Sequence, residues 1–268
     1  MILCFSGTGN TRSAADQLSR ALGDHVVRLA PGLMREPSKI RLRVPDKRLI
    51  WSFPIHGWGL PYTVAKVIRE MQILGHRDVV HHFVCTCGDD LGYADKIWRS
   101  EIAARGWRAG SAFSVQMPNN YVALPGFDID SPELQKEKLA KMPERVEAIA
   151  EKLLSQDKAT DVVRGSFPWM KSYVLGWWFR RFLTSIKRFH ASSACIGCGI
   201  CARGCPLGSI EIVDGRPRWE GQCTMCLRCY HICPKHAVEC GNATKDKGQY
   251  LHPGYFEKEM ENIRTNIK

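Results

Sequence analysis

Eight cysteines occur in two copies of one spacing pattern, and this pattern is the most informative feature of the sequence. Each copy reads C-x2-C-x2-C-x3-C-P, so three closely spaced thiols are followed by a fourth and by a proline. Soft thiolate sulfurs at this spacing are typical ligands of iron–sulfur clusters. The candidate metal ligands are Cys195, Cys198, Cys201 and Cys205 in the first run, and Cys223, Cys226, Cys229 and Cys233 in the second.

Zinc is the competing metal, because it also binds four thiolates. Structural zinc sites favour two separated C-x2-C pairs that close one tetrahedron. Three thiols at this spacing followed by Cys-Pro, and repeated, fit a zinc site poorly. A tight loop of three cysteines can supply three ligands to a compact cluster, whose fourth ligand must come from elsewhere. The pattern therefore favours iron and sulfide.

Residues 191–242 are an internal repeat with an offset of 28 residues. This segment resembles the bacterial two-[4Fe-4S] ferredoxins. The resemblance implies two cubane clusters that each carry one electron, with the fourth cysteine of each run ligating the other cluster. By that rule Cys233 completes the first site and Cys205 completes the second. Each half is expected to supply two short strands and a turn of helix.

Other residues of the repeat have simpler expected roles. Cys240 aligns with Ile212, which predicts a small buried apolar residue and not a ligand. Tyr230 and His231 lie between the last two cysteines of the second run. A titratable side chain near a cluster can shift its potential, but we expect His231 to be exposed to solvent.

A second motif follows the strand-like residues at the N-terminus. Its glycines permit a tight turn, its hydroxyls and backbone N–H groups can surround a phosphate, and the helix that follows adds a favourable dipole. The motif lacks the lysine of a triphosphate loop and the G-x-G-x-x-G spacing of a dinucleotide site. It consists of Ser6, Gly7, Thr8, Gly9, Asn10 and Thr11.

This loop resembles the flavodoxin phosphate loop [ST]-x-T-G-N-T, and residues 86–95 are similar to the flavodoxin flavin loop G-D-Q-x-x-Y-A-[DE]. The resemblance covers residues 1–155 and implies FMN beside the first and third strands. It also implies that Tyr93 stacks on the isoalloxazine. Asp90 stands where flavodoxins usually have Gln. The flavin-loop residues thus implicated are Thr86, Cys87, Gly88, Asp89 and Tyr93.

The loop after the third strand should reach the other face of the flavin. In flavodoxins this loop often contributes an aromatic ring, and here either His56 or Trp58 can take that place. A redox role for Cys87 at the flavin edge is a minor alternative, whereas Cys4 and Cys85 lie in apolar strands and are expected in the core. The implicated loop residues are Pro54, Ile55, His56, Gly57 and Trp58.

Strand-like and helix-like segments alternate along the first part of the chain, which predicts a parallel sheet covered on both faces. The resemblance to flavodoxins and ferredoxins implies an α/β flavodoxin-like doubly wound sheet of order 2-1-3-4-5, followed by a small α+β ferredoxin-like domain. The last helix is expected to begin at Ser131, with Pro132 suited to its first helical position, and Pro143 predicts a kink or break in it. The expected strands are 1–5, 25–29, 47–53, 79–86 and 108–116, and the expected helices before the last one are 11–22, 61–73 and 94–105. The expected domains are 1–156, a connector 157–190, 191–242 and a tail 243–268.

The connector is both aromatic and basic. It holds seven of the chain's Lys and Arg residues against two Asp, within a total net charge of +11. Val174, Trp178, Phe182 and Ile186 recur at helical spacing, and apolar residues occur around most of the circumference. We expect a helix wedged between the two domains. A helix on a membrane surface is the alternative.

The composition indicates a globular protein, with 44% hydrophobic and 24% charged residues. No basic segment with a long apolar stretch precedes the first strand, so we expect a cytoplasmic protein whose twelve cysteines serve metal binding more than disulfides. The basic strip at 156–190 can attract an acidic redox partner or anionic lipid, and we expect no binding to nucleic acid.

Taken together, the chain resembles the flavodoxin–ferredoxin fusion proteins of anaerobic bacteria and archaea. The resemblance implies an electron-transfer protein with FMN and two [4Fe-4S] clusters, which links one-electron and two-electron partners. An FMN-dependent reductase of a small molecule, supplied by its own clusters, is the alternative, so the sequence leaves open whether the chain is an enzyme. A basic binding module with structural clusters is a third hypothesis. No pair of residues suggests acid–base or nucleophilic catalysis.

Overall fold

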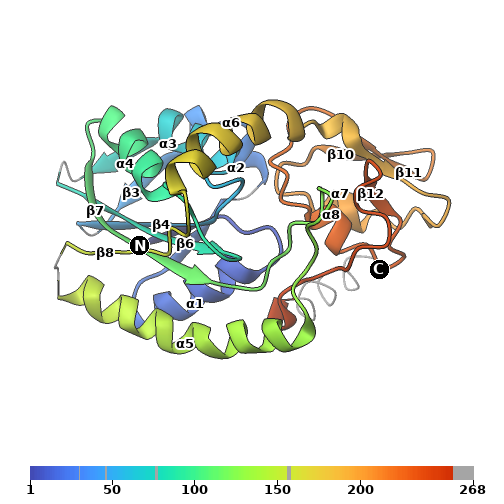
Figure 1. Cartoon of the computed structure of the whole chain (residues 1–268). Helices are drawn as coiled ribbons and strands as arrows, with labels where there is room; N and C mark the ends of the chain where they lie inside the picture. The colour runs from blue at the N-terminus through green and yellow to red at the C-terminus, as the bar shows by residue number, and fades with distance from the viewer. Residues whose placement is uncertain (30, 46, 76–77, 156–157, 256–268) are drawn as a thin grey trace.

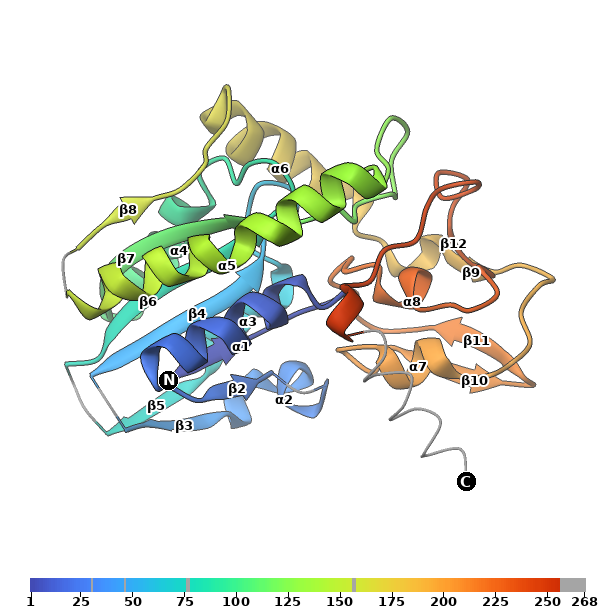
Figure 2. The same ribbon diagram turned by 90° about the horizontal axis from the view of Figure 1, so that it is seen from below.

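The structure, a computed structural model, describes residues 1–29, 31–45, 47–75, 78–155 and 158–255. The chain forms a larger N-terminal α/β lobe and a smaller lobe that contains both cysteine runs, and the two lie side by side (Figure 1). Figure 2 shows the last described residues returning from the smaller lobe toward helix α1. The end of the expected tail, residues 256–268, and the expected boundary at 156–157 lie outside the described residues.

The larger lobe is built on a parallel sheet of order β2-β1-β4-β6-β7-β8. Numbered by their appearance in this sheet, the first five strands have the order 2-1-3-4-5, which confirms the doubly wound flavodoxin-like class. The strands are β1 (Ile2–Cys4), β2 (Val26–Arg28), β4 (Arg48–Pro54), β6 (Val80–Cys87), β7 (Arg108–Gln116) and β8 (Thr160–Asp161).

Alternating side chains of the strands fill two separate cores on opposite faces of the sheet. Ile2 packs in one core with Leu18 of helix α1, whereas Leu3 packs in the other with Val64 and Trp98. This alternation follows from the two-residue period of a strand. One face is covered by α1 (Asn10–Leu22) and α5 (Pro132–Leu154), the other by α3 (Tyr62–Glu70) and α4 (Ala94–Ala104) (Figures 1 and 2).

A short parallel ribbon beside the main sheet was missed by the sequence analysis. Residues 61–73 were expected as one helix, but the helix ends at Glu70 and Gln72 already belongs to a strand. Pairing with a distant strand overrides the local helical spacing here, because strand formation depends on tertiary partners. The added elements are α2 (Pro31–Arg35), the 3-10 turn η1 (Pro37–Lys39), and the paired strands β3 (Arg41–Val44) and β5 (Gln72–Gly75).

Helix α5 runs through Pro143 as one continuous element, so the expected break does not occur. The Pro143 side chain is exposed, and its carbonyl accepts a hydrogen bond from Gln17 Nε2 at 3.1 Å. Because the ring lies on the solvent side, the Leu139 carbonyl that loses its helical N–H can be hydrated.

The smaller lobe contains two antiparallel ladders and two short helices, which matches the expected content of an α+β ferredoxin-like repeat. Asp214 and Gly215 both have positive φ and form the two-residue turn of one hairpin. Cys240 is fully buried in the lobe's core, as expected. The elements are β9 (Phe189–Ala191) paired with β12 (Val238–Cys240), β10 (Ile210–Val213) paired with β11 (Arg216–Trp219), α7 (Ile200–Gly204) and α8 (Arg228–His231).

The two ends of the connector belong to the two lobes, and the residues between these ends form a helix. β8 extends the large sheet and β9 already belongs to the small lobe. Between them runs a helical segment, here called the surface helix, made of η2 (Met170–Leu175), α6 (Gly176–Trp178) and η3 (Phe179–Leu183), with a 3-10 turn η4 (Ile186–Arg188) after it. The expectation of a buried, wedged helix is wrong. Only Ser172, Gly176 and Phe179 of this helix are buried.

His81 illustrates how the core tolerates histidine only in its neutral form. Its Nδ1 accepts a hydrogen bond from Trp51 Nε1 at 2.9 Å, and its ring stacks on Trp107 at 4.7 Å. Burial lowers the pKa of His81 from 6.5 to about 4. The pKa values of His82 and His231 are also lowered to about 4, chiefly by burial. The unfolded chain therefore binds more protons than the folded chain between pH 6.5 and pH 4.

We expect the free energy of unfolding to fall as the pH is lowered through this window. His81→Gln keeps an acceptor for Trp51 and should remove on the order of 2 to 3 kcal/mol of the pH dependence between pH 7 and pH 4. Anoxic guanidinium denaturation, followed by circular dichroism at several pH values, measures this. His190→Gln, at an exposed position, is the control and should parallel the wild type. A His81→Gln profile parallel to the wild type would contradict the assignment.

Candidate cofactor sites

The eight predicted metal ligands line two cavities in a crossed grouping. Each cavity is lined by the first three cysteines of one run and the fourth of the other, as the ferredoxin resemblance implied. One cavity, here called site 1, is lined by Cys195, Cys198, Cys201 and Cys233. The other, site 2, is lined by Cys205, Cys223, Cys226 and Cys229.

The cysteine thiols of both sites must lose their protons before they can bind a metal cluster. Burial raises the pKa of Cys201 to about 11 and that of Cys223 to about 12. Metal binding must therefore displace protons from these sulfurs. Backbone N–H groups already point at some of them: Met225 N lies 3.3 Å from Cys223 Sγ, and Ala237 N lies 3.2 Å from Cys233 Sγ. Such hydrogen bonds stabilise thiolate charge and tune the potential of a cluster.

Within the described part of the chain, no three His, Cys, Asp or Glu side chains are grouped so that they could hold a single metal ion. The cysteines of sites 1 and 2 instead surround cavities. A cavity ringed by four thiols is what a multi-iron cluster requires, so the donor set fits the predicted group.

A third cavity, here called the loop pocket, lies at the carboxyl ends of the strands of the large sheet. Loops that follow β1, β4, β6 and β7 all contribute to it, which is the binding position expected at the switch point of a doubly wound sheet. The predicted flavin residues that line it are Ser6, Gly7, Thr8, Asn10, Thr11, Pro54, Ile55, His56, Gly57, Thr86, Cys87 and Gly88.

Four predicted flavin residues do not line the loop pocket: Gly9, Trp58, Asp89 and Tyr93. Gly9 precedes α1 with a φ of 100°, which only glycine adopts readily. The ring of Tyr93 lies under Lys96 Nζ at 3.6 Å from its centroid. The carbonyl of Trp58 accepts a hydrogen bond from Ser172 of the surface helix. Of the two aromatics left open in the third-strand loop, His56 is therefore the one at the pocket.

Several further residues line the loop pocket from the far side. Tyr121 and Phe179 meet edge to face at 5.5 Å, and Phe179 comes from the surface helix. The Tyr121 hydroxyl is buried and has no hydrogen-bond partner among the described residues. A buried hydroxyl without a partner fits a pocket that takes a polar ligand. The other residues of this wall are Met117, Pro118, Asn119, Asn120, Met225, Cys226 and Leu227. The sequence analysis did not assign Phe179, Met225 or Leu227 to the pocket.

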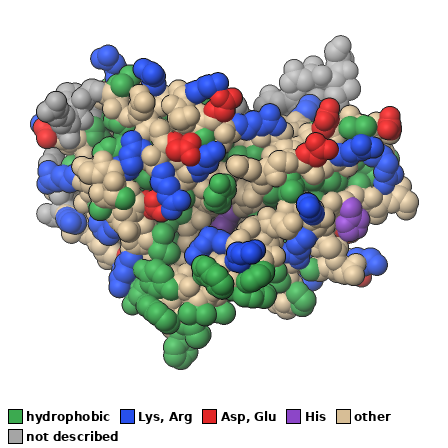
Figure 3. All heavy atoms as spheres, turned by 90° about the horizontal axis from the view of Figure 1, so that it is seen from above, with side chains coloured by type: hydrophobic (Ala, Val, Ile, Leu, Met, Phe, Trp, Pro, Cys, Tyr) green, Lys and Arg blue, Asp and Glu red, His purple; other side chains and the backbone are tan. Residues whose placement is uncertain are grey.

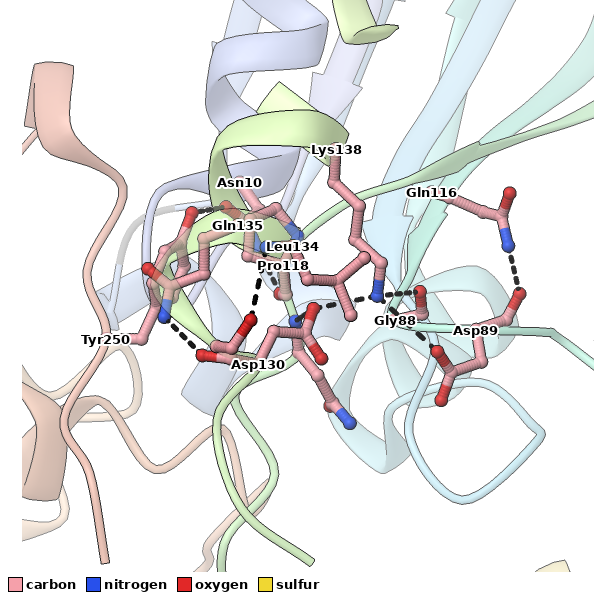
Figure 4. A network of polar contacts seen from close by, with 12 residues as sticks. Asn10, Gly88, Asp89, Gln116, Pro118, Asp130, Leu134, Gln135, Lys138 and Tyr250 are labelled. Carbon is pink, nitrogen blue, oxygen red and sulfur yellow. Dashed lines mark hydrogen bonds and ion pairs between the residues drawn. The ribbon is translucent and has the colours of Figure 1, made fainter. Parts of the chain in front are cut away.

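A polar network holds the loops of the pocket in place (Figure 4). Lys138 of α5 donates to the Gly88 carbonyl at 2.9 Å and pairs with Asp130 at 2.7 Å. Asn10 donates to the Pro118 carbonyl at 2.9 Å. The network therefore ties the phosphate loop, the 86–89 loop and the segment after β7 to one another, with Lys138 at its centre.

Cys226 belongs to two cavities at once, because it lines both site 2 and the loop pocket. A Cβ added to Gly7 of the phosphate loop would lie 2.9 Å from Cys226 Cβ. Arg228 donates to the Gly7 carbonyl at 2.6 Å, and His56 Nδ1 lies 2.9 Å from the Thr224 carbonyl. The second cysteine loop is thus pressed directly against the loops that line the pocket.

The second cysteine loop has the same left-handed backbone conformation as the first, but at residues that are not glycine. Gly197 and Gly199 have φ of 69° and 71° in the first loop, and Met225 and Leu227 have φ of 54° and 56° at the equivalent positions. A side chain in this left-handed conformation costs roughly 1 kcal/mol or more. Met225 and Leu227 are both 2% exposed, and their packing between site 2 and the loop pocket offsets that cost.

His231 is buried, not exposed as expected. Its Nδ1 accepts from the Tyr250 backbone N–H at 3.2 Å, so Nε2 carries the proton and donates to the Asn120 carbonyl at 2.7 Å. The hydroxyl of Tyr250 in turn donates to Asn10 Oδ1 at 2.6 Å. His231 therefore fastens the smaller lobe and the start of the C-terminal tail to the wall of the loop pocket.

Comparison with known proteins supports the reading of the smaller lobe. Residues 194–238 match the family of 4Fe-4S dicluster domains. The chain is 31% identical over 64 residues to an Escherichia coli protein named "Putative electron transport protein YsaA", and the match covers 21% of this chain. The chain spans only 41% of the length of that relative.

Solved structures resemble the larger lobe more distantly. A flavodoxin from Streptococcus pneumoniae is 19% identical, with a TM-score of 0.36, and the match covers 58% of this chain and 97% of the flavodoxin. An azoreductase from Bacillus anthracis is 10% identical, also with a TM-score of 0.36, and the match covers 56% of this chain and 97% of the azoreductase. Because these similarities are low, the fold assignment rests on the strand order. The chain joins a domain of flavodoxin-like fold to a 4Fe-4S dicluster domain.

The crossed grouping of cysteines can be tested by exchanging the two crossing residues one at a time. Cys233→Ala should remove the cluster of site 1, and Cys205→Ala the cluster of site 2, so each variant should keep about half of the wild-type iron. Only Cys205→Ala should disturb the absorbance of a molecule bound in the loop pocket. Iron analysis and EPR of anoxically prepared protein measure this. Equal disturbance of the pocket by both variants would contradict the grouping.

The contact between Gly7 and Cys226 predicts a second effect. In Gly7→Ala the new methyl group would also lie 3.2 Å from the Cys226 carbonyl, and such overpacking costs about 1 to 3 kcal/mol. We expect a lower melting temperature together with reduced flavin content. Gly254→Ala is the matched control, because its Cβ would approach no described atom closer than 3.7 Å. Wild-type flavin content in Gly7→Ala would count against the predicted contact.

Proposed function

We propose that this chain is an electron-transfer protein that binds FMN in the loop pocket and a [4Fe-4S] cluster in each of sites 1 and 2. When bound, FMN exchanges two electrons singly and each cluster exchanges one, so the chain links one-electron and two-electron redox partners. The observation that carries this proposal is the double position of Cys226. Cys226, with its neighbour Leu227, lines both site 2 and the loop pocket, so no domain motion is needed to bring the two together.

The surroundings of the two cysteine sites support an order for the relay. Site 1 lies near the surface, where Ile196, next to Cys195, is 61% exposed. Site 2 lies deeper, and Cys229 and Cys226 are enclosed by the phosphate loop and the core of the smaller lobe. An external partner therefore has access to site 1, and site 2 stands between site 1 and the pocket.

The residues around the pocket are suited to bind a phosphate and to place a neutral side chain beside a bound ring. Backbone N–H groups and hydroxyls of residues 6–11 are suited to hold a phosphate at the start of α1. Burial lowers the pKa of His56 to about 4, so this residue lines the pocket as a neutral ring at physiological pH. A neutral His56 adds no positive charge near a bound ring and keeps its hydrogen bond to the second cysteine loop.

The decisive measurement is anoxic purification with iron, sulfide and flavin quantified, followed by stepwise reduction monitored by absorbance and EPR. We expect two clusters and one FMN per chain. The Cys233→Ala variant should keep its flavin. Its flavin should be reduced several-fold more slowly by a one-electron protein donor, because the cluster of site 1, which the donor reaches first, is lost. Colourless protein, or protein that carries zinc in place of iron, would overturn the proposal.

A second candidate function, reduction of a small organic molecule, is favoured by one further hollow. It has a volume of about 450 Å³ and is lined by His56, Phe179 and Cys223 among others. This volume suits a small ligand, and the hollow touches both site 2 and the third-strand loop. Rapid turnover of small oxidants by the purified protein with a chemical reductant would favour this function. Slow turnover of all of them would leave the carrier function as the better account.

A further inference from the structure

The surface helix carries the largest group of exposed apolar side chains in the described part of the chain. Trp169, just before the helix, is 60% exposed, Trp177 is 57% exposed and Phe182 is 51% exposed. Large side chains of this kind are usually buried, and a contiguous exposed group marks an interaction surface. The other exposed members of this group are Phe167, Met170, Tyr173, Val174, Leu175 and Trp178.

Ser172, Gly176 and Phe179 form the face of the helix that contacts the protein, and the first two are small. Ser172 Oγ accepts from the Tyr93 backbone N–H at 2.7 Å and donates to the Trp58 carbonyl at 2.8 Å. A Cβ added to Gly176 would lie 2.6 Å from the Gly57 carbonyl. The helix therefore packs tightly on the loops after β4 and β6. Phe179 faces the body of the protein, whereas Trp177, Trp178 and Phe182 are exposed.

The charge around this face is positive. The sequence contains no Asp or Glu between residues 162 and 210. Lys171 is already paired with Asp90, but Arg181 and Lys187 are exposed at the C-terminal end of the helix. Figure 3 shows hydrophobic side chains that stand out from the molecule as a protruding group, with Lys and Arg side chains beside it.

We propose that this face of the surface helix binds the surface of an anionic lipid bilayer. Tryptophan, tyrosine and phenylalanine flanked by Lys and Arg are the side chains that interfacial helices place at the boundary of headgroups and acyl chains. No described helix has the length and hydropathy to cross a bilayer. The exposed aromatic face suits a helix that lies in the plane of the surface. The inference does not depend on which cofactors the protein binds.

Shape and charge favour a bilayer over another copy of this chain. The apolar group protrudes, so it suits a fluid surface that can close around it more than a flat protein face. Two copies docked through this face would also bring their positive charges together, which opposes association. Anionic headgroups supply the opposite charge, and each Lys or Arg near such a surface adds to binding.

Co-sedimentation with vesicles tests the proposal directly. The intact protein should sediment with vesicles of equal parts phosphatidylglycerol and phosphatidylcholine at low salt, and much less with phosphatidylcholine alone. Binding should weaken as salt is raised. The double variant Arg181→Gln with Lys187→Gln should lose about fivefold in partitioning for each charge removed.

The apolar contribution is tested with the triple variant Trp169→Ser, Trp177→Ser and Trp178→Ser. These side chains are exposed, so we expect wild-type iron content and melting temperature but a loss of vesicle binding of at least the size seen for the charge variant. Leu154→Ser is the matched control. Leu154 is 55% exposed on α5, on the opposite face of the large sheet, and its exchange should leave vesicle binding unchanged.

Three outcomes would overturn the proposal. The first is wild-type protein that stays in the supernatant with anionic vesicles at low salt. The second is vesicle binding that is undiminished in both the triple variant and the charge variant. The charge variant keeps all aromatic side chains and should fold normally. The third is a wild-type protein that forms a dimer and does not bind vesicles, together with a triple variant that is monomeric. This result would assign the exposed face to a second copy of the chain.

Discussion

The close contact between the phosphate loop and the second cysteine loop is the constraint on which the rest of this structure depends. Gly7 can approach Cys226 only because it lacks a side chain, and Met225 and Leu227 on either side of Cys226 adopt left-handed conformations that side chains normally avoid. Both features bring one cysteine site to the wall of the loop pocket. The phosphate loop and the second cysteine loop thus meet directly at the boundary between the two domains.

Polar contacts around that boundary join the two lobes. His56 reaches the Thr224 carbonyl from the larger lobe, and His231 reaches the Asn120 carbonyl from the smaller one. Burial lowers the pKa of both histidines to about 4, so their hydrogen bonds are those of neutral rings. Neutral buried contacts avoid the desolvation cost that charged pairs would bring at the same place.

The surface helix gives a structural reason for the residue at which the flavin loop departs from the flavodoxin pattern. Asp90 does not line the loop pocket but pairs with Lys171 of the helix. The same helix supplies Phe179 to the pocket, next to Gly57. A segment that the flavodoxin resemblance does not cover therefore completes the pocket wall and holds two of its loops. The surface helix therefore contributes Phe179 to the pocket wall while its other large aromatic side chains are exposed.

The sequence by itself determined the parts that depend on local spacing. The cysteine spacing predicted iron–sulfur ligands, and alternating strands and helices predicted a parallel sheet covered on both faces, because ligand spacing and hydrophobic period are properties of neighbouring residues. The crossed grouping of the cysteines and the strand order came from the resemblance to ferredoxins and flavodoxins, whose motifs are also local. Only the tertiary structure decided which cysteine site adjoins the pocket, that His231 is buried, and that the aromatic helix is exposed. These outcomes depend on contacts between residues more than 100 positions apart, such as Asn120 with His231, and local sequence carries no signal for such pairings. The composition of the surface helix predicted burial, but small residues at 172 and 176 turned its large side chains outward.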